Sequence, residues 1–95
     1  MTLHSMKTDK QTNDEYVAEW EGDPWYPAIK GAHDKLTELI PGYHIEQIKE
    51  KFWFLRYYFT APRGTDDATL LKAYEIVRKA EDEAGDWREV HAAAK

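Results

Sequence analysis

The sequence predicts a small α+β domain of two layers, in which helices pack on one antiparallel β-hairpin. Three observations support this prediction. Apolar residues recur at three- and four-residue spacing in two long segments, which is typical of amphipathic helices. Two shorter segments between them are rich in aromatic and β-branched residues, which is typical of strands. The chain has 95 residues, enough for one domain with a modest core.

The first residues differ in character from the rest of the chain. Residues 1–12 lack the apolar stretch of a signal peptide, so we predict a flexible tail followed by a single α+β domain over residues 13–95. A short helix is predicted over residues 13–21, because their apolar side chains are three and four residues apart. Asn13 is the expected N-cap, and Gly22 is a suitable stop.

A long amphipathic helix is predicted over residues 27–40. It follows a proline-containing connector, residues 23–27, and Pro27 suits the first position of a helix. Pro41 ends it. The expected buried face consists of Ile29, Ala32, His33, Leu36, Leu39 and Ile40. His33 is therefore interpreted as a residue at the edge of the core and not as a ligand.

The two strands are predicted near residues 43–49 and 52–60. Ile45 and Ile48 are three residues apart, so strict alternation places them on opposite faces. Either a β-bulge or burial on both faces would reconcile them. In the second strand, alternation predicts one face with Trp53, Leu55, Tyr57 and Phe59, and another with Phe52, Phe54, Arg56 and Tyr58.

Both faces of this second strand are apolar enough to need covering. A helix layer can cover one face, and the tail, a second copy or a partner would cover the other. A lone two-stranded hairpin is marginal in water. We therefore expect that a homodimer with a four-stranded sheet completes the fold.

A second long helix is predicted after Thr65, which is the expected N-cap, and it ends at Gly85. Its expected buried stripe consists of Leu70, Ala73, Tyr74, Val77, Ala80 and Ala84. Beyond it, Asp86 and Glu89 resemble a capping pair for a short last helix. The final residues 92–95 are expected to fray.

Composition narrows the classes of function. The formal net charge is −5, which argues against a general nucleic-acid binder because backbone phosphates require Lys and Arg. The chain has no cysteine, which excludes disulfides and thiol chemistry. No apolar run has the length of a membrane span. We expect a soluble cytoplasmic protein that does not enter a membrane.

No pattern of residues indicates catalysis. The histidines at positions 4, 33, 44 and 91 do not have the spacing of a metal-binding motif, and no glycine-rich phosphate loop is present. The only serine, Ser5, is in the predicted tail. We therefore expect a protein that is not an enzyme and that holds neither a metal nor a cofactor.

One segment, residues 48–58, alternates basic residues with large aromatic ones. The candidate binding residues in it are Trp53, Phe54, Lys51, Arg56 and Lys49. Aromatic and Arg side chains are enriched among residues that dominate interface energies. We expect a protein partner. The alternative is a nucleic-acid-binding module, in which the aromatic rings stack on bases and the basic side chains contact phosphates.

A structural interpretation of the same aromatic residues stays open beside the functional one. Trp53 and Phe54 are either surface anchors for a partner or part of the core. In the second case they would pack under Trp20, Trp25 or the tail. The sequence favours the core somewhat, because large aromatic side chains dominate the cores of small domains.

The segment IKEKFWFLRYY resembles the IKEKFGGLRFY stretch of a family of small uncharacterised proteins that bacteriophages and prophages encode. The match consists of Ile48, Lys49, Glu50, Lys51, Phe52, Leu55, Arg56, Tyr57 and Tyr58, and the resemblance covers about residues 36–84. It implies a phage accessory protein that acts in the host cytoplasm by binding a protein, such as a host factor. The family has no established activity, so the resemblance assigns no residue a role.

The chain departs from this family pattern in two ways. Trp53 and Phe54 replace the paired glycines that would form the hairpin turn. We therefore expect the turn at residues 49–51, or a longer hairpin. Many family members also continue into a cysteine-bearing C-terminus with a zinc-like pattern, and this chain lacks one, so the resemblance implies no metal here.

Overall fold

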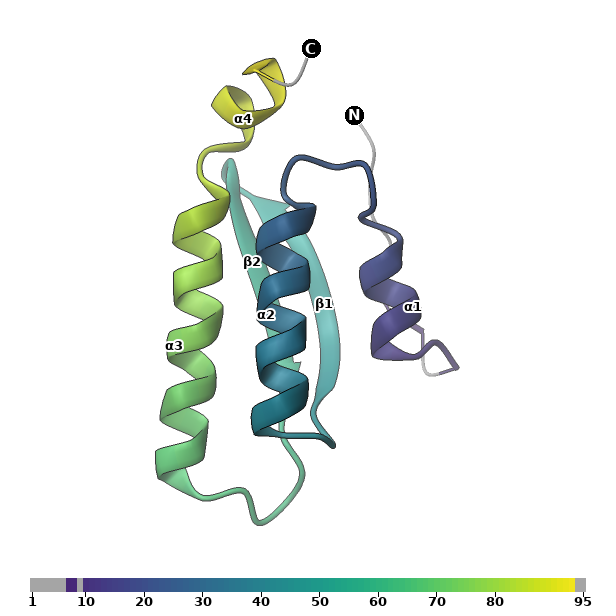
Figure 1. The fold of residues 1–95 in the computed structure, drawn as a ribbon, viewed down its shortest axis with the longest axis vertical. Helices are drawn as coiled ribbons and strands as arrows, with labels where there is room; N and C mark the ends of the chain where they lie inside the picture. Colours follow the sequence, from purple (N-terminus) through teal and green to yellow (C-terminus); the bar gives the residue numbers. More distant parts are fainter. Residues whose placement is uncertain (1–6, 9, 94–95) are drawn as a thin grey trace.

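The computed structural model describes residues 7–8 and 10–93. The elements in chain order are α1 (Asn13–Ala18), α2 (Tyr26–Leu39), β1 (His44–Lys51), β2 (Phe54–Thr60), α3 (Asp67–Ala84) and α4 (Trp87–Ala93). Figure 1 shows α2 and α3 side by side across one face of the β1–β2 hairpin, with α1 beside β1 and α4 beyond the end of α3. The predicted two-layer α+β domain is confirmed.

The hairpin turn lies at a different place from the predicted one. Lys51 pairs with Phe54, so Phe52 and Trp53 alone form the turn. Residues 49–51, where we expected the turn, belong to β1. The second strand accordingly begins at Phe54 and not at residue 52. Tight two-residue turns usually contain Asn or Gly, and the aromatic pair therefore gave no signal of a turn.

A β-bulge in β1 resolves the conflict between its two isoleucines. The register shifts between Ile45 and Gln47, which leaves Glu46 as an extra residue opposite the partner strand. Ile45 and Ile48 are both fully buried as a result. Of the two alternatives that the spacing left open, the bulge is the correct one.

The N-cap of α1 is Thr12 and not Asn13. The Thr12 hydroxyl accepts a hydrogen bond from the Glu15 amide at 3.0 Å, and the Glu15 carboxylate accepts one from the Thr12 amide at 2.9 Å. This reciprocal pair is a capping box. The helix is also shorter than predicted and ends at Ala18.

The ends of the longer helices are close to the predicted positions. α2 begins at Tyr26, so Pro27 is its second residue. The N-cap of α3 is Asp66 and not Thr65. The Thr65 hydroxyl instead donates to the Pro62 carbonyl at 2.7 Å, and this bond keeps Thr65 in the preceding turn.

The core lies between the helices and the inner face of the hairpin. Its largest fully buried side chains are Trp20, Trp25, Tyr16, Ile29, Leu36, Ile45, Ile48, Leu55 and Val17. His33 is 4% exposed, so its predicted place at the core is correct. Tyr74, predicted to be buried on α3, is 55% exposed. It contacts only the rim of the core, with its ring centre 5.3 Å from that of Phe59.

A chain of hydrogen bonds runs from the surface into this core. Asp14 Oδ1 lies 2.5 Å from His33 Nε2, and His33 Nδ1 lies 2.5 Å from the Tyr43 hydroxyl. The Tyr43 hydroxyl is in turn 2.8 Å from the hydroxyl of Tyr57. The polar atoms of three buried aromatic side chains thus satisfy one another, as buried polar groups must.

Side chains of α1 cover the outer edge of β1. Asn13 donates to the Tyr43 carbonyl at 2.8 Å and accepts from the Ile45 amide at 3.0 Å. The Tyr16 hydroxyl accepts from the Ile48 amide at 3.0 Å and donates to the Ile48 carbonyl at 3.2 Å. Asn13 therefore serves the strand edge, which explains why it is not the helix cap.

The outer edge of β2 is partly covered as well. Glu81 on α3 accepts a hydrogen bond from the Tyr57 amide at 3.1 Å, and Arg56 donates to the Leu55 carbonyl at 3.1 Å. Unpaired strand edges are the usual templates for pairing between chains. A four-stranded dimer would have to displace these side chains, so the expected homodimer stays a prediction, and its strand-to-strand form is disfavoured.

Two predictions concern residues outside the described part of the chain. Most of the expected flexible tail, residues 1–6 together with residue 9, lies outside it. Residues 94–95 of the segment expected to fray also lie outside it. Within the predicted tail, Thr12 takes part in the fold as the cap of α1.

Candidate functional site: an aromatic hairpin tip

Three consecutive aromatic residues occupy the end of the hairpin, and we call Phe52, Trp53 and Phe54 the aromatic tip. Phe52 is 77% exposed, and Trp53 and Phe54 are each 43% exposed. The interpretation that Trp53 and Phe54 fill the core under Trp20 and Trp25 is therefore wrong. Both side chains lie at the surface, where they are accessible to a partner.

The backbone of the aromatic tip is strained. Phe52 has a φ of 50° and Trp53 a φ of 75°. A positive φ is uncommon for residues other than Gly, Asn and Asp, and a genuine outlier for bulky ones. Each such residue costs about 1–3 kcal/mol, and strain of this kind concentrates at functional sites.

Two hydrogen bonds hold the backbone of Trp53 in this conformation. The Glu50 carboxylate accepts from the Trp53 amide at 2.7 Å. The Trp53 carbonyl accepts from the Trp87 amide, also at 2.7 Å. Because Trp87 is the first residue of α4, its amide has no partner within the helix and is available to the turn. The last helix therefore braces the hairpin.

The side chain of Trp53 is also held. The guanidinium carbon of Arg88 lies 4.9 Å from the centre of the Trp53 ring, within the range of a cation–π contact. Arg88 is itself fixed by two hydrogen bonds to the Asp86 carboxylate, at 3.1 and 2.8 Å. These bonds hold the pKa of the Asp86 carboxyl below its usual value, so the ion pair persists under mildly acidic conditions.

α4 is anchored to the body of the domain through aromatic rings. Trp87 packs edge-on against the buried Trp25, with ring centres 4.9 Å apart. His91 stacks on Trp87 at 3.4 Å, and His91 Nε2 lies 3.2 Å from an Asp23 oxygen. The aromatic tip is thus connected to the core through α4.

The face of the hairpin away from the helices extends this site, and we call it the outer sheet face. It is formed by the cross-strand pairs Gln47–Tyr58, Lys49–Arg56 and Lys51–Phe54. Lys49 Nζ lies 5.7 Å from the centre of the Tyr58 ring, and Lys51 Nζ lies 5.9 Å from that of Phe52. The five sequence-predicted binding residues therefore lie together at the tip and on this adjoining face.

Sequence reasoning missed the residues that brace the tip. Arg88 and Trp87 are more than thirty positions away from Trp53 in the chain. Nothing in their local sequence indicates contact with the hairpin. The Asp86-x-Arg88 spacing could have indicated a local ion pair, but its position over Trp53 depends on the fold.

The strained turn gives a stability prediction. We expect Phe52→Asn to stabilise the protein by about 1 kcal/mol, because Asn tolerates the left-handed region and the Phe52 side chain is 77% exposed. Chemical denaturation would measure the change, with Phe52→Ala as the control that removes the ring but keeps the strain. A destabilised Phe52→Asn variant would show that the ring contributes more than its conformation costs.

Comparisons with protein-family models, with curated proteins and with solved structures found no match. The resemblance to phage-encoded proteins over about residues 36–84 therefore rests on the sequence pattern alone.

Residues 7–8 and 10–93 contain no helix that is long and apolar enough to cross a membrane. They also contain no group of three or more His, Cys, Asp or Glu side chains placed to hold a metal ion.

Proposed function

We propose that this protein acts by binding another protein through the aromatic tip and the outer sheet face. The observation that carries the proposal is the aromatic tip itself, where bulky rings are exposed at a backbone strained by positive φ values. A turn of Asn and Gly would form the same hairpin without this cost. Exposed aromatic anchors of this kind dominate the energies of protein interfaces.

The bracing of the tip supports the same proposal. Glu50, Trp87 and Arg88 hold Trp53 in one conformation. Binding through a rigid side chain loses less conformational entropy than binding through a mobile one. The surrounding cations indicate the chemistry of the partner: Lys51, Arg56 and Arg88 suit an acidic rim around an apolar pocket.

The biological setting follows from the resemblance of residues 48–58. It supports a phage accessory protein that acts in the host cytoplasm, with a host factor as the partner. We propose that a homodimer would form through the outer sheet face. Pairing of strand edges is disfavoured, because side chains already bond to much of both edges.

The alternative function is binding of single-stranded nucleic acid. The observation in its favour is that Phe54, Tyr58 and Lys49 lie on one open sheet face, with Lys49 close to the Tyr58 ring. Sheets with exposed aromatic and basic residues bind single strands by stacking and phosphate contacts. Fluorescence polarisation with labelled single-stranded and duplex oligonucleotides would distinguish this function. Nucleic-acid binding predicts an affinity for the oligonucleotide that falls steeply as the salt concentration rises. This affinity should be lost when Lys49, Lys51 and Arg56 are neutralised.

The double variant Trp53→Ala, Phe54→Ala tests the proposed function. A partner is first captured from bacterial lysate with the intact protein and identified by mass spectrometry. Its affinity is then measured by calorimetry with purified components. We expect the double variant to bind at least about 30-fold more weakly, which corresponds to one hot-spot residue. The melting temperature should change little, because both side chains are 43% exposed.

The matched control is Leu71→Ala on α3, where another apolar side chain is 64% exposed. This variant should retain full affinity. Retained affinity in the Trp53→Ala, Phe54→Ala variant would contradict the proposal. A loss of several kcal/mol in the free energy of unfolding, seen as a large fall in its melting temperature, would instead show that the two rings are structural.

A further inference from the structure

A groove lies between α2 and α3, and these helices are side by side over the hairpin (Figure 1). Its wide end has a volume of about 350 Å³ and is lined by Lys35, Leu39, Lys72, Glu75, Ile76 and Lys79. No strand residue lines it, so it opens on the side of the helix layer turned away from the sheet. The groove is therefore separate from the aromatic tip and the outer sheet face.

The other end of the groove is narrow. Its lining consists of the small residues Ala28, Gly31, Ala32 and Ala80 together with Lys35, Ile76, Lys79 and Glu83. The space there is about 20 Å³, close to what a single water molecule requires. A helix or an aromatic ring cannot enter such a space. A ligand of the groove would therefore lie at the wide end.

The wide end is positively charged in an otherwise acidic chain. Lys35, Lys72 and Lys79 line it together with a single acidic residue, Glu75. Within residues 7–8 and 10–93, no carboxylate oxygen lies within 4.0 Å of the three lysine amines. Lys30, on the same helix as Lys35, differs in this respect because it pairs with Asp34 at 2.5 Å.

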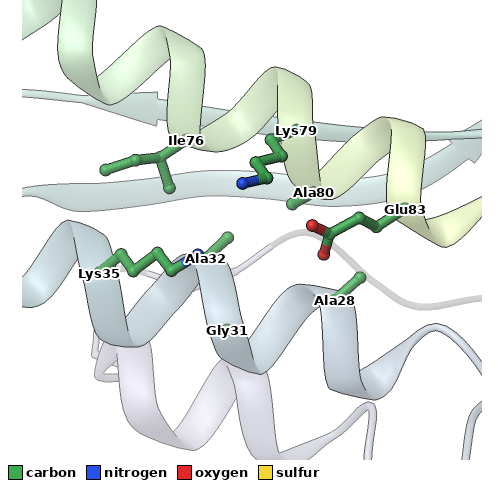
Figure 2. A pocket seen from close by; sticks show the side chains of 8 residues that line it. All are labelled: Ala28, Gly31, Ala32, Lys35, Ile76, Lys79, Ala80 and Glu83. Atoms are coloured by element: carbon green, nitrogen blue, oxygen red, sulfur yellow. The ribbon is translucent and has the colours of Figure 1, made fainter.

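Figure 2 shows the narrow end, which two of these cations, Lys35 and Lys79, line together with Glu83. The side chains of Lys35 and Lys79 extend from opposite helices into the space between them. Glu83 adds a carboxylate at the narrow end, whereas at the wide end three lysines share the single acidic residue Glu75, so a bound anion there would offset an excess of positive charge. Leu39 and Ile76, both half-buried, add an apolar wall beside the amines.

We infer that the wide end of this groove binds a small amphiphilic anion. Its carboxylate or phosphate head would lie among the amines of Lys35, Lys72 and Lys79, and its short aliphatic chain would lie against Leu39 and Ile76. The volume is in the range of small-molecule sites, about 300–1,000 Å³. Lysine is a common partner of phosphate and carboxylate groups as a point charge.

The test uses the full chain labelled with ¹⁵N and titrated with octanoate or octyl phosphate in amide correlation spectra. We expect saturable shifts of the amides at 35, 39, 72, 75, 76 and 79, and the stronger of the two ligands identifies the preferred head group. Octanol and inorganic phosphate should each bind at least about tenfold more weakly, because each lacks one of the two contacts. Equal binding of either one would overturn the amphiphilic assignment.

Variants locate the site. Lys35→Gln combined with Lys79→Gln should weaken binding of the preferred ligand by about tenfold or more and leave the circular dichroism spectrum unchanged, since both side chains are exposed. Lys30→Gln is the matched control on the same helix and should have no effect. Unchanged affinity in the double variant would overturn the inference. So would shifts confined to the aromatic tip, or no saturable shifts up to about 10 mM ligand.

Discussion

We expect the protein to unfold cooperatively as the pH rises above about 10, the usual pKa of tyrosine. Burial raises the pKa of the Tyr43 and Tyr57 hydroxyls far above that value. It also raises the pKa of Tyr16, whose hydroxyl bonds to the backbone of β1. The native state therefore keeps three phenolic protons under conditions in which the unfolded chain releases them.

The direction of the effect follows from proton linkage. Above about pH 10 the unfolded state binds fewer protons than the native state, so the free energy of unfolding falls as the pH rises. Tyr43 and Tyr57 each contribute up to about 1.4 kcal/mol per pH unit, roughly 3 kcal/mol per unit together, and Tyr16 adds to this over the range between its unfolded and native pKa values. The stability of a small domain is about 5–15 kcal/mol, so it should be lost within a few pH units. Below pH 10 this contribution is fully present.

Far-UV circular dichroism and tyrosinate absorbance, recorded on the same samples against pH, would check this prediction. Part of the tyrosinate signal should appear only together with the loss of helical structure. Tyr57→Phe should flatten the pH dependence by about 1.4 kcal/mol per unit. Complete ionisation of all tyrosines in a chain that keeps its native spectrum would contradict the prediction.

A second large effect is expected at the outer edge of β1. Tyr16→Phe removes the hydroxyl that bonds to both the amide and the carbonyl of Ile48. Each buried group left unpaired costs about 1–3 kcal/mol, so the variant should lose about 3 kcal/mol. For a domain of this size, that corresponds to a fall of roughly 10–20 °C in melting temperature.

Adding Asn13→Ala to Tyr16→Phe should also change the state of association. Asn13 covers the next part of the edge through Tyr43 and Ile45, and an uncovered strand edge pairs readily with other chains. Light scattering should detect association of the double variant at micromolar concentration. A double variant that stays monomeric would show that other parts of the chain protect this strand edge.

Tyr26→Phe is the matched control, because the Tyr26 side chain is half-buried and its hydroxyl makes no hydrogen bond within the described residues. Its stability should change by less than about 0.5 kcal/mol. Thermal melts of Tyr16→Phe and Tyr26→Phe would thus separate the loss of the Ile48 contacts from the loss of a hydroxyl as such. Equal melting temperatures of the two variants would contradict the proposed role of Tyr16.

Repeating local patterns in the sequence determined the fold class. The three- and four-residue spacing of Ile29, Ala32 and Leu36 gives α2 a continuous apolar face, and such a face is stable only when it packs on another layer. Alternation in β2 separated Leu55 and Tyr57 from Phe54, Arg56 and Tyr58, and the structure buries the first pair and leaves the other three on the outer sheet face. The candidate binding residues could be chosen from sequence because basic and aromatic residues are concentrated in residues 48–58.

Contacts between distant residues decided what the sequence left open or indicated wrongly. The turn lies at Phe52–Trp53 because Glu50 and the first amide of α4 hold an unfavourable backbone there. Asn13 bonds to the edge of β1, and Thr12 caps α1 in its place. Local sequence cannot reveal which of two acceptable partners a side chain takes, because that choice depends on which edge or helix end the fold brings within hydrogen-bonding distance.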